Sequence, residues 1–265
     1  MNRNLLLVAA FTAQQVLSRR KTAVLLLLSC VPAAFGLIIR YFAAGANADP
    51  FYWAAPLVYT AFLCQVLPLF FAGSLIRDAV EDRTAAFVLT TPVGRSTFVF
   101  GTLLGLIPPL VLLTVGSVVL TFAAWRHGVE AWWSDPEPRA LLLNLVGVAS
   151  VGTCLYAALF TLLGLVVKWP TVVGVAYYGL FELFLGFTPG PAQNLPLSTS
   201  LEALLRPPFR RRVEFVAEEA RLPAQLLRSP SEGALTLLIA TAVICLALVW
   251  RARNRDFAEE SAAAR

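Results

Sequence analysis

The sequence predicts an all-α, polytopic membrane protein with six transmembrane helices, and three observations lead to this fold class. Of the 265 residues, 58% are hydrophobic and only 14% are charged, whereas soluble domains carry about 25% charged residues. The apolar residues gather in long runs, and a bilayer core of about 30 Å requires about 20 such residues in a helix. This composition excludes a soluble globule, a disordered chain and a small secreted disulfide scaffold.

The chain before the first span, residues 1–21, predicts an interfacial elbow helix. Leu6 and Ala13 fall on one side of a helical wheel, and Gln14 and Arg19 fall on the other. An amphipathic helix of this kind lies in the membrane interface. An uncleaved N-terminal anchor without further function is the alternative.

Six apolar segments follow as predicted spans within a single transmembrane domain, residues 1–265. Residues 22–187 hold spans one to five, 188–232 form an extracytoplasmic loop, 233–250 hold span six and 251–265 form a cytoplasmic tail. Helix-compatible residues between two proline sites make the loop partly helical around 214–221. The predicted spans are Thr22–Ala44, Ala54–Ile76, Thr97–Ala124, Ala140–Val167, Thr171–Phe187 and Gly233–Trp250.

The distribution of basic residues predicts that both termini are cytoplasmic. With this orientation, twelve Lys and Arg residues lie inside, and the short outer loops hold only Arg40, Arg126 and Arg139. The loop 188–232 places six more Arg outside, but its five Glu offset them, and long polar segments translocate with less regard to charge. The net charge of +5 favours anionic lipid as a partner, and no nucleic-acid-binding pattern is present.

No catalytic constellation is present in the sequence, so we expect that the chain is not an enzyme. His127 is the only histidine, and the sequence contains no P-loop, nucleophile elbow or dinucleotide-binding fingerprint. The four cysteines lie in apolar runs without metal-ligand spacing, so no metal site is expected.

A mixed-charge loop between the second and third predicted spans, residues 77–95, is the most informative stretch. Acidic and basic residues precede an apolar patch, which ends at Pro92-Val93-Gly94-Arg95. A short helix with charged and apolar faces suits docking into a groove of a soluble partner, and a solvated connector is the alternative. The candidate docking residues are Arg77, Asp78, Glu81, Asp82, Arg83, Thr84 and Phe87.

In this loop the chain resembles the permeases of the type-2 family of ATP-binding-cassette (ABC) transporters. That family commonly has an acidic turn, Gly-Thr, an apolar stretch, Pro-aliphatic-Ser-Arg and a later Gly-Lys. The matching positions here are Glu81-Asp82, Arg83-Thr84, Phe87-Val88-Leu89, Pro92-Val93-Gly94-Arg95 and Gly101-Thr102, with Arg83 and Thr102 as departures. The Arg-rich end of the last span, Trp250–Phe257, is a second match.

The resemblance implies a permease subunit of an ATP-driven exporter in a prokaryotic cytoplasmic membrane. Two six-span chains, identical or different, would pair, and each would rest its loop 77–95 on a separate ABC ATPase subunit that binds ATP and Mg. The chain itself is then expected to bind no cofactor. A membrane scaffold that uses the loop 188–232 to hold an outer partner is the alternative function. The sequence does not identify the substrate.

One carboxylate, Glu182, lies eleven residues into the fifth predicted span, about 16 Å along a helix. An ionisable group at this depth costs about 3 kcal/mol by insertion scales, so we expect Glu182 to face a helix interface or a polar cavity. In the resembling family this span lies near the transport pathway, which makes Tyr177, Tyr178 and Glu182 candidate pathway residues. A purely structural hydrogen bond and an intramembrane enzymatic role are the alternatives.

Overall fold

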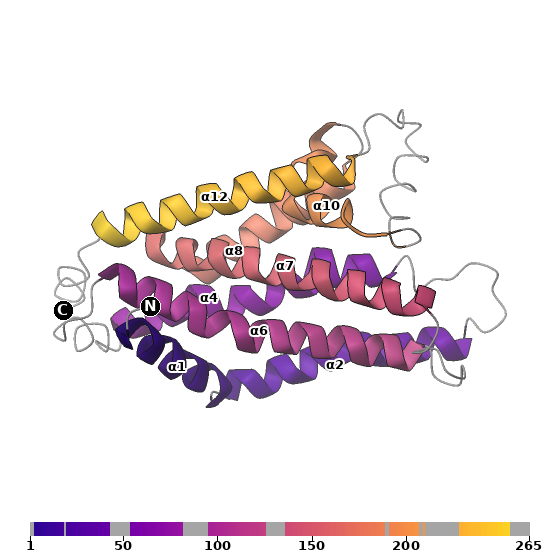
Figure 1. Ribbon diagram of the computed structural model, residues 1–265, viewed down its shortest axis with the longest axis horizontal. Coiled ribbons are helices and arrows are strands. Elements are labelled where there is room, and N and C mark those ends of the chain that lie inside the picture. The colour runs from indigo at the N-terminus through magenta and orange to yellow at the C-terminus, as the bar shows by residue number, and fades with distance from the viewer. Residues whose placement is uncertain are drawn as a thin grey trace.

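The computed structural model describes residues 3–18, 20–42, 54–81, 95–125, 136–188, 191–206, 209 and 228–254. Within these ranges the fold is all-α (Figure 1). The elements are α1 (Arg3–Ser18), α2 (Arg20–Phe42), η1 (Leu57–Leu63), α4 (Cys64–Glu81), α6 (Arg95–Trp125), α7 (Pro136–Val166), α8 (Pro170–Tyr177), η2 (Tyr178–Phe184), α9 (Leu185–Phe187), η3 (Pro191–Asn194), α10 (Leu197–Glu202) and α12 (Pro230–Asn254).

Among the described residues, four helices are long and apolar enough to cross a membrane, as expected of an integral membrane protein. They are Ala54–Gly73, Ser96–Trp125, Pro138–Val166 and Pro230–Asn254, which agree with the second, third, fourth and sixth predicted spans. The first and fifth predicted spans correspond to shorter apolar helices, Leu26–Ile38 and Pro170–Phe184.

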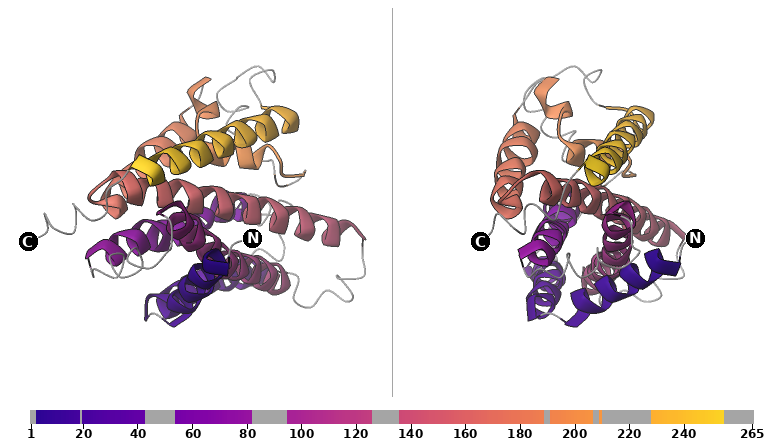
Figure 2. Two further views of the ribbon diagram at one scale, coloured as in Figure 1. Left: turned by 60° about the vertical axis from the view of Figure 1, so that its left-hand side comes forward. Right: turned by 90° about the vertical axis from the view of Figure 1, so that its left-hand side faces the viewer.

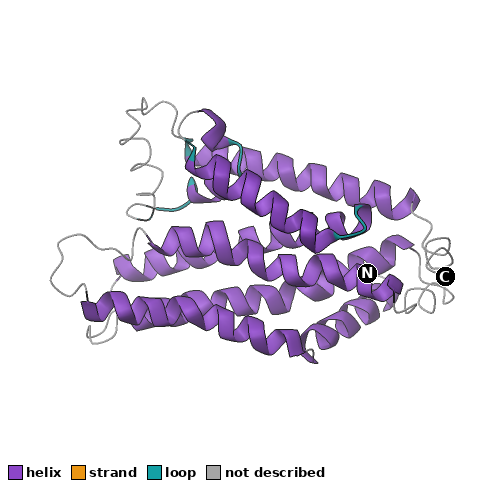
Figure 3. Cartoon of the chain, turned by 180° about the vertical axis from the view of Figure 1, so that it is seen from behind, coloured by secondary structure: helices purple, strands orange, loops and turns teal. Residues whose placement is uncertain are grey.

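The helices form layers around α7, which contacts helices on both sides. Seen end-on in Figure 2, α7 lies between α12 and α8 above and α4 and α6 below, while α1 and α2 cover the far side of α6. Figure 3 shows the same arrangement from behind. The start of α1 and the C-terminal end of α12 lie toward one end of the bundle, where α4 ends and α6 begins (Figure 1).

The contact between α1 and α6 depends on two glycines because the backbones approach closely. A Cβ at Gly105 of α6 would lie 2.2 Å from the Ala9 carbonyl oxygen of α1, and one at Gly101 would lie 2.7 Å from Val8. Gly101 and Gly105 thus form a G-x-x-x-G pair, the small-residue pattern that lets membrane helices pack backbone to backbone. The segment predicted as an elbow is therefore a separate helix seated on α6. Its position relative to a membrane interface stays a prediction.

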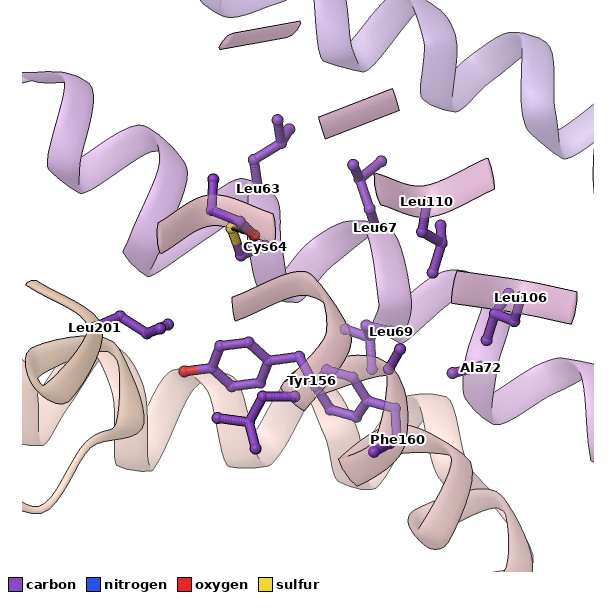
Figure 4. Close-up of a cluster of buried hydrophobic side chains, with 14 of the residues drawn as sticks. Leu63, Cys64, Leu67, Leu69, Ala72, Leu106, Leu110, Tyr156, Phe160 and Leu201 are labelled. Atoms are coloured by element: carbon purple, nitrogen blue, oxygen red, sulfur yellow. Dashed lines mark hydrogen bonds between the residues drawn. The ribbon is translucent and has the colours of Figure 1, made fainter. Parts of the chain in front are cut away.

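The hydrophobic core lies where α4, α6 and α7 meet. In Figure 4, Leu67 and Leu69 of α4 point into the same region as Leu106 of α6 and Phe160 of α7. Tyr156 of α7 is also buried here, and its hydroxyl points toward the segment that carries α10. The apolar core therefore extends directly into a polar region, which is where the candidate site lies.

Only part of the predicted loop 188–232 is described, and that part packs against the helices, while its extracytoplasmic side stays a prediction. Residues 198–202 of α10 are buried, and α10 packs against α7, α12 and η1. The loop is partly helical as predicted, but its described helix lies at 197–202. The predicted helix at 214–221 falls outside the described residues. Tertiary contacts explain the difference, because residues that are polar in sequence find buried partners in the fold.

Candidate functional site: a buried carboxylate that holds an inserted helix

Glu182 lies in η2, a π-helical stretch that continues α8. Helix α8 starts at Pro170. Proline suits the first helical turn because backbone N–H groups there have no intrahelical acceptor, so no hydrogen bond is lost. Between α8 and α9 the chain widens into the π-helical residues 178–184, in which Glu182 is the buried one. Its side chain is fully enclosed, with 0% exposed. The prediction that this carboxylate faces the protein interior is therefore confirmed.

Four donors converge on the Glu182 carboxyl group. The Tyr156 and Tyr177 hydroxyls donate to Oε1 at 2.9 and 2.8 Å, and the Leu197 N–H approaches the same oxygen at 3.3 Å. The Ser198 N–H donates to Oε2 at 3.1 Å. Carboxyl oxygens accept hydrogen bonds, and the two oxygens of Glu182 provide acceptors for all four donors. Glu182 thereby connects α7, α8 and the first turn of α10.

A second buried carboxylate holds the other end of α10. Glu202, at the C-terminal end of this helix, is 2% exposed, and Thr60 of η1 donates a hydrogen bond to its Oε1 at 2.9 Å. The Arg228 guanidinium donates to the hydroxyl of Ser200, also on α10. Buried polar groups of this kind must be paired, since an unpaired one costs about 1–3 kcal/mol. Helix α10 is thus held by polar bonds at both ends.

Each carboxylate bond involves one of the two π-helical stretches of the described chain. The stretch η1 supplies Thr60, the donor to Glu202, and η2 supplies Glu182 itself. Extra residues in a π-helical turn shift the side chains that follow, and such turns are frequent at functional sites. Here the two wide turns aim their polar side chains at the same inserted helix.

Further contacts fix the segment that follows α10. The Asn144 side chain of α7 donates to the Leu204 carbonyl at 3.2 Å and accepts from the Arg206 N–H at 2.8 Å. A Cβ at Gly233, in the first turn of α12, would lie 2.8 Å from the Ser200 carbonyl oxygen. Helix α12 therefore begins in close contact with α10.

Two buried polar atoms in this region have no partner. They are Ser198 Oγ and Gln65 Oε1, on residues that are 1% and 0% exposed. Ser198 is also the residue whose N–H bonds Glu182. A buried hydroxyl without a partner leaves room for a further hydrogen bond from water or a ligand.

An aromatic wall separates Glu182 from an open groove between α7 and the α8–η2 segment. The Tyr177 ring stacks on Phe181 with centroids 5.6 Å apart, and meets Phe160 edge-to-face at 6.4 Å. These three rings line a groove of about 290 Å³, together with apolar residues that include Leu163 and Ala176. The ring of Tyr177 thus faces the groove, and its hydroxyl faces Glu182.

The predicted pathway residues are only partly brought together. Tyr177 and Glu182 are in contact, whereas the Tyr178 ring lies against Phe62 of η1, with centroids 6.4 Å apart. A wide π-helical turn begins at Tyr178, so neighbouring tyrosines face different helices. The transport role of these residues stays a prediction.

The predicted docking loop is described only at its edges. Arg77, Asp78 and Glu81 belong to the last turns of α4. Asp82, Arg83, Thr84 and Phe87 lie outside the described residues. The helix that the sequence predicts before the apolar patch therefore starts as a continuation of α4.

Sequence reasoning did not identify Tyr156, Thr60, Glu202 or α10 as parts of the site. Tyr156 and Thr60 lie in apolar runs, where a single hydroxyl gives no signal of its own. The pattern Leu197–Glu202 contains three hydroxyl residues and a carboxylate, which is typical of a solvated turn. Only the partners Glu182 and Thr60, distant in sequence, make this composition compatible with burial.

Within the described ranges, no group of three or more His, Cys, Asp or Glu side chains could hold a metal ion. Comparison of the chain with models of known protein families finds no match, and comparison with curated proteins finds none either.

Proposed function

We propose that this chain is the membrane-spanning permease subunit of an ABC exporter and works with a separate ATPase subunit. The observation that carries the proposal is the loop 77–95, whose charged turn, apolar patch and Pro-Val-Gly-Arg ending resemble the ATPase-docking segment of type-2 permeases. The last turn of α4 and the first turn of α6, which flank this loop, lie toward the same end of the bundle as the start of α1 and the end of α12 (Figure 1). The helix ends that flank the predicted docking loop and the two tails are thus at one end of the bundle.

In this proposal the docking end faces the cytoplasm of a prokaryotic cell, and Leu26–Ile38 and Pro170–Phe184 complete a set of six spans. Two chains, identical or different, surround the pathway, and ATP and Mg are bound by the ATPase subunit. Movement of the loop reaches the bundle through α4, because α4 is one continuous helix from Cys64 to Glu81. It packs against α7 and α8, so a force on its end is transmitted to the elements that surround Glu182.

Co-purification tests this function directly. The full chain is expressed with an ATPase encoded beside it, and the retained ATPase and its nucleotide hydrolysis are measured. Reversal of charge in the double variant Glu81→Lys, Asp82→Lys is expected to abolish retention, since it replaces the acidic turn with a basic one. Glu130→Lys, in a predicted outer loop, is the matched control and should retain the ATPase.

Two outcomes contradict the proposal: no nucleotide-binding protein is retained by the unmodified chain, or the double reversal leaves retention and hydrolysis intact. The scaffold alternative predicts the second outcome, together with a partner that binds the segment 188–232. The described part of that segment packs inside the bundle, which favours the permease.

A further inference from the structure

The groove and the Glu182 carboxyl group lie on opposite sides of the Tyr177 side chain. The groove is lined by apolar and aromatic side chains from two elements and has a volume of about 290 Å³, close to the lower limit of small-molecule sites, about 300 Å³. Glu182 Oε1 lies 2.8 Å from the hydroxyl of Tyr177, one of the lining residues. The polar end of a ligand with its apolar body in the groove would therefore be directed past Tyr177 toward this carboxyl group.

The donors that now satisfy Glu182 include two that a ligand can replace. Tyr156 and Tyr177 belong to long helical segments, but the Leu197 and Ser198 N–H groups come from a short helix inserted against the site. An ammonium group carries three N–H donors and a positive charge. It would form shorter and stronger bonds to a carboxylate than neutral backbone N–H groups do.

The surroundings of the carboxyl group favour a cation. The stacked rings of Tyr177 and Phe181 line the groove, and aromatic faces attract ammonium groups. The Ser198 hydroxyl is buried without a partner beside Glu182, and it can accept one N–H bond. The carboxyl oxygens, the aromatic rings and an unused acceptor therefore agree on one kind of ligand.

We propose that the groove and Glu182 form the binding site for a hydrophobic amine, with the apolar body in the groove and the ammonium on the carboxylate. The backbone N–H groups of α10 occupy the carboxylate when no ligand is present. This assignment rests on the proposed function, and it names the class of substrate that the exporter would carry. Binding of the amine releases the first turn of α10, so the ligand and α10 compete for the same two oxygens.

The test uses the full chain in lipid nanodiscs without any ATPase, and two fluorescent probes that differ in one charge. Monodansylcadaverine carries a primary ammonium, and its N-acetyl derivative has the same apolar body without the charge. The amine is expected to bind about tenfold more tightly than the acetylated probe, because hydrogen bonds to charged groups are the stronger ones.

Three variants and two controls assign the site. Glu182→Gln should remove the preference for the amine, and Ala176→Leu and Ala176→Phe, which fill the groove, should weaken both probes. The first control is Glu232→Gln, which changes an exposed carboxylate of α12. The second is Leu238→Phe, which enlarges a side chain that is 69% exposed on the same helix. Both controls should bind like the unmodified protein.

Equal binding of the two probes overturns the proposal, as does a Glu182→Gln protein that still prefers the amine. If that variant does not fold, the Ala176 variants decide, since unchanged amine binding in them excludes the groove. The binding test contains no ATPase, so a negative result for amine binding does not affect the co-purification result. A negative co-purification result likewise does not affect the measurement of amine binding.

Discussion

Helices α1 and α10 are both secondary elements seated on the bundle, and they are held in opposite ways. The first lies on α6 through Gly101 and Gly105, where the backbones nearly touch. The second is surrounded by side chains and held by hydrogen bonds that it donates to Glu182 and accepts from Thr60. Contact by small residues depends on shape, whereas polar attachment depends on pairing, so the two should respond to different substitutions.

Loss of the Glu182 carboxylate is expected to have the largest effect. Glu182→Leu leaves two tyrosine hydroxyls and two backbone N–H groups without their acceptor, which should lower the free energy of unfolding by about 4 kcal/mol. Thermal unfolding in detergent measures this loss. Glu182→Gln keeps one carbonyl oxygen for both tyrosines and should lose less. Equal losses in the two variants would contradict a role based on hydrogen bonding.

A side chain at the α1 contact is expected to have the next largest effect. Gly105→Ala places a methyl group 2.2 Å from the Ala9 carbonyl oxygen, and α1 must move away. Such overpacking costs about 3 kcal/mol. Gly116→Ala in the same helix is the matched control, because a Cβ there meets nothing within 4 Å. Similar unfolding midpoints for the two variants would refute the close contact.

The bond between η1 and α10 should contribute less, because only one donor is lost. Thr60→Val keeps the shape of the side chain but removes the donor to Glu202, at an expected cost of about 2 kcal/mol. Thr161→Val, in α7, is the comparison, and its hydroxyl bonds the Ala157 carbonyl of its own helix. The unfolding midpoint should fall further for Thr60→Val. The opposite order would show that Glu202 does not depend on this bond.

The smallest effect is expected at the start of α12, where the hydrogen bonds are exposed to solvent. Ser229 and Glu232 form a capping box: the Ser229 N–H donates to Glu232 Oε2 at 2.8 Å, and the Glu232 N–H donates to Ser229 Oγ at 3.3 Å. Ser229→Ala should lower the free energy of unfolding by about 1 kcal/mol. A loss as large as that of Glu182→Leu would mean that α12 and α10 fold as one unit.

The α1 and α10 regions also differ in how far the sequence predicts them. Apolar runs predict the positions of the helices to within a few residues, because each run must be long enough to cross hydrocarbon. The run before Arg19 likewise predicts a separate first helix, since its apolar and polar residues follow a helical period. The contact with α6 was not predicted, because Gly101 and Gly105 show only that a close approach is possible.

The burial of Glu182 follows from the sequence alone, because a carboxylate in an apolar run has few alternatives to an interior position. Its partners do not follow from it. Tyr156 and the backbone of Leu197 and Ser198 are 26, 15 and 16 residues away, and no local pattern connects them. The inserted α10 was expected as outer loop because its composition is polar. Burial of polar residues is stable only when partners are present, and partners are a property of the tertiary structure.

The sequence by itself therefore determined that this chain belongs in a lipid bilayer and which segments contact the lipid, because hydrophobic length and charge are additive along a chain. Which polar groups meet inside the bundle was decided only by the tertiary structure, because hydrogen bonds require distances and directions between residues that the chain order leaves open. The groove, the carboxylate behind it and the helix that occupies that carboxylate belong to this second kind of information.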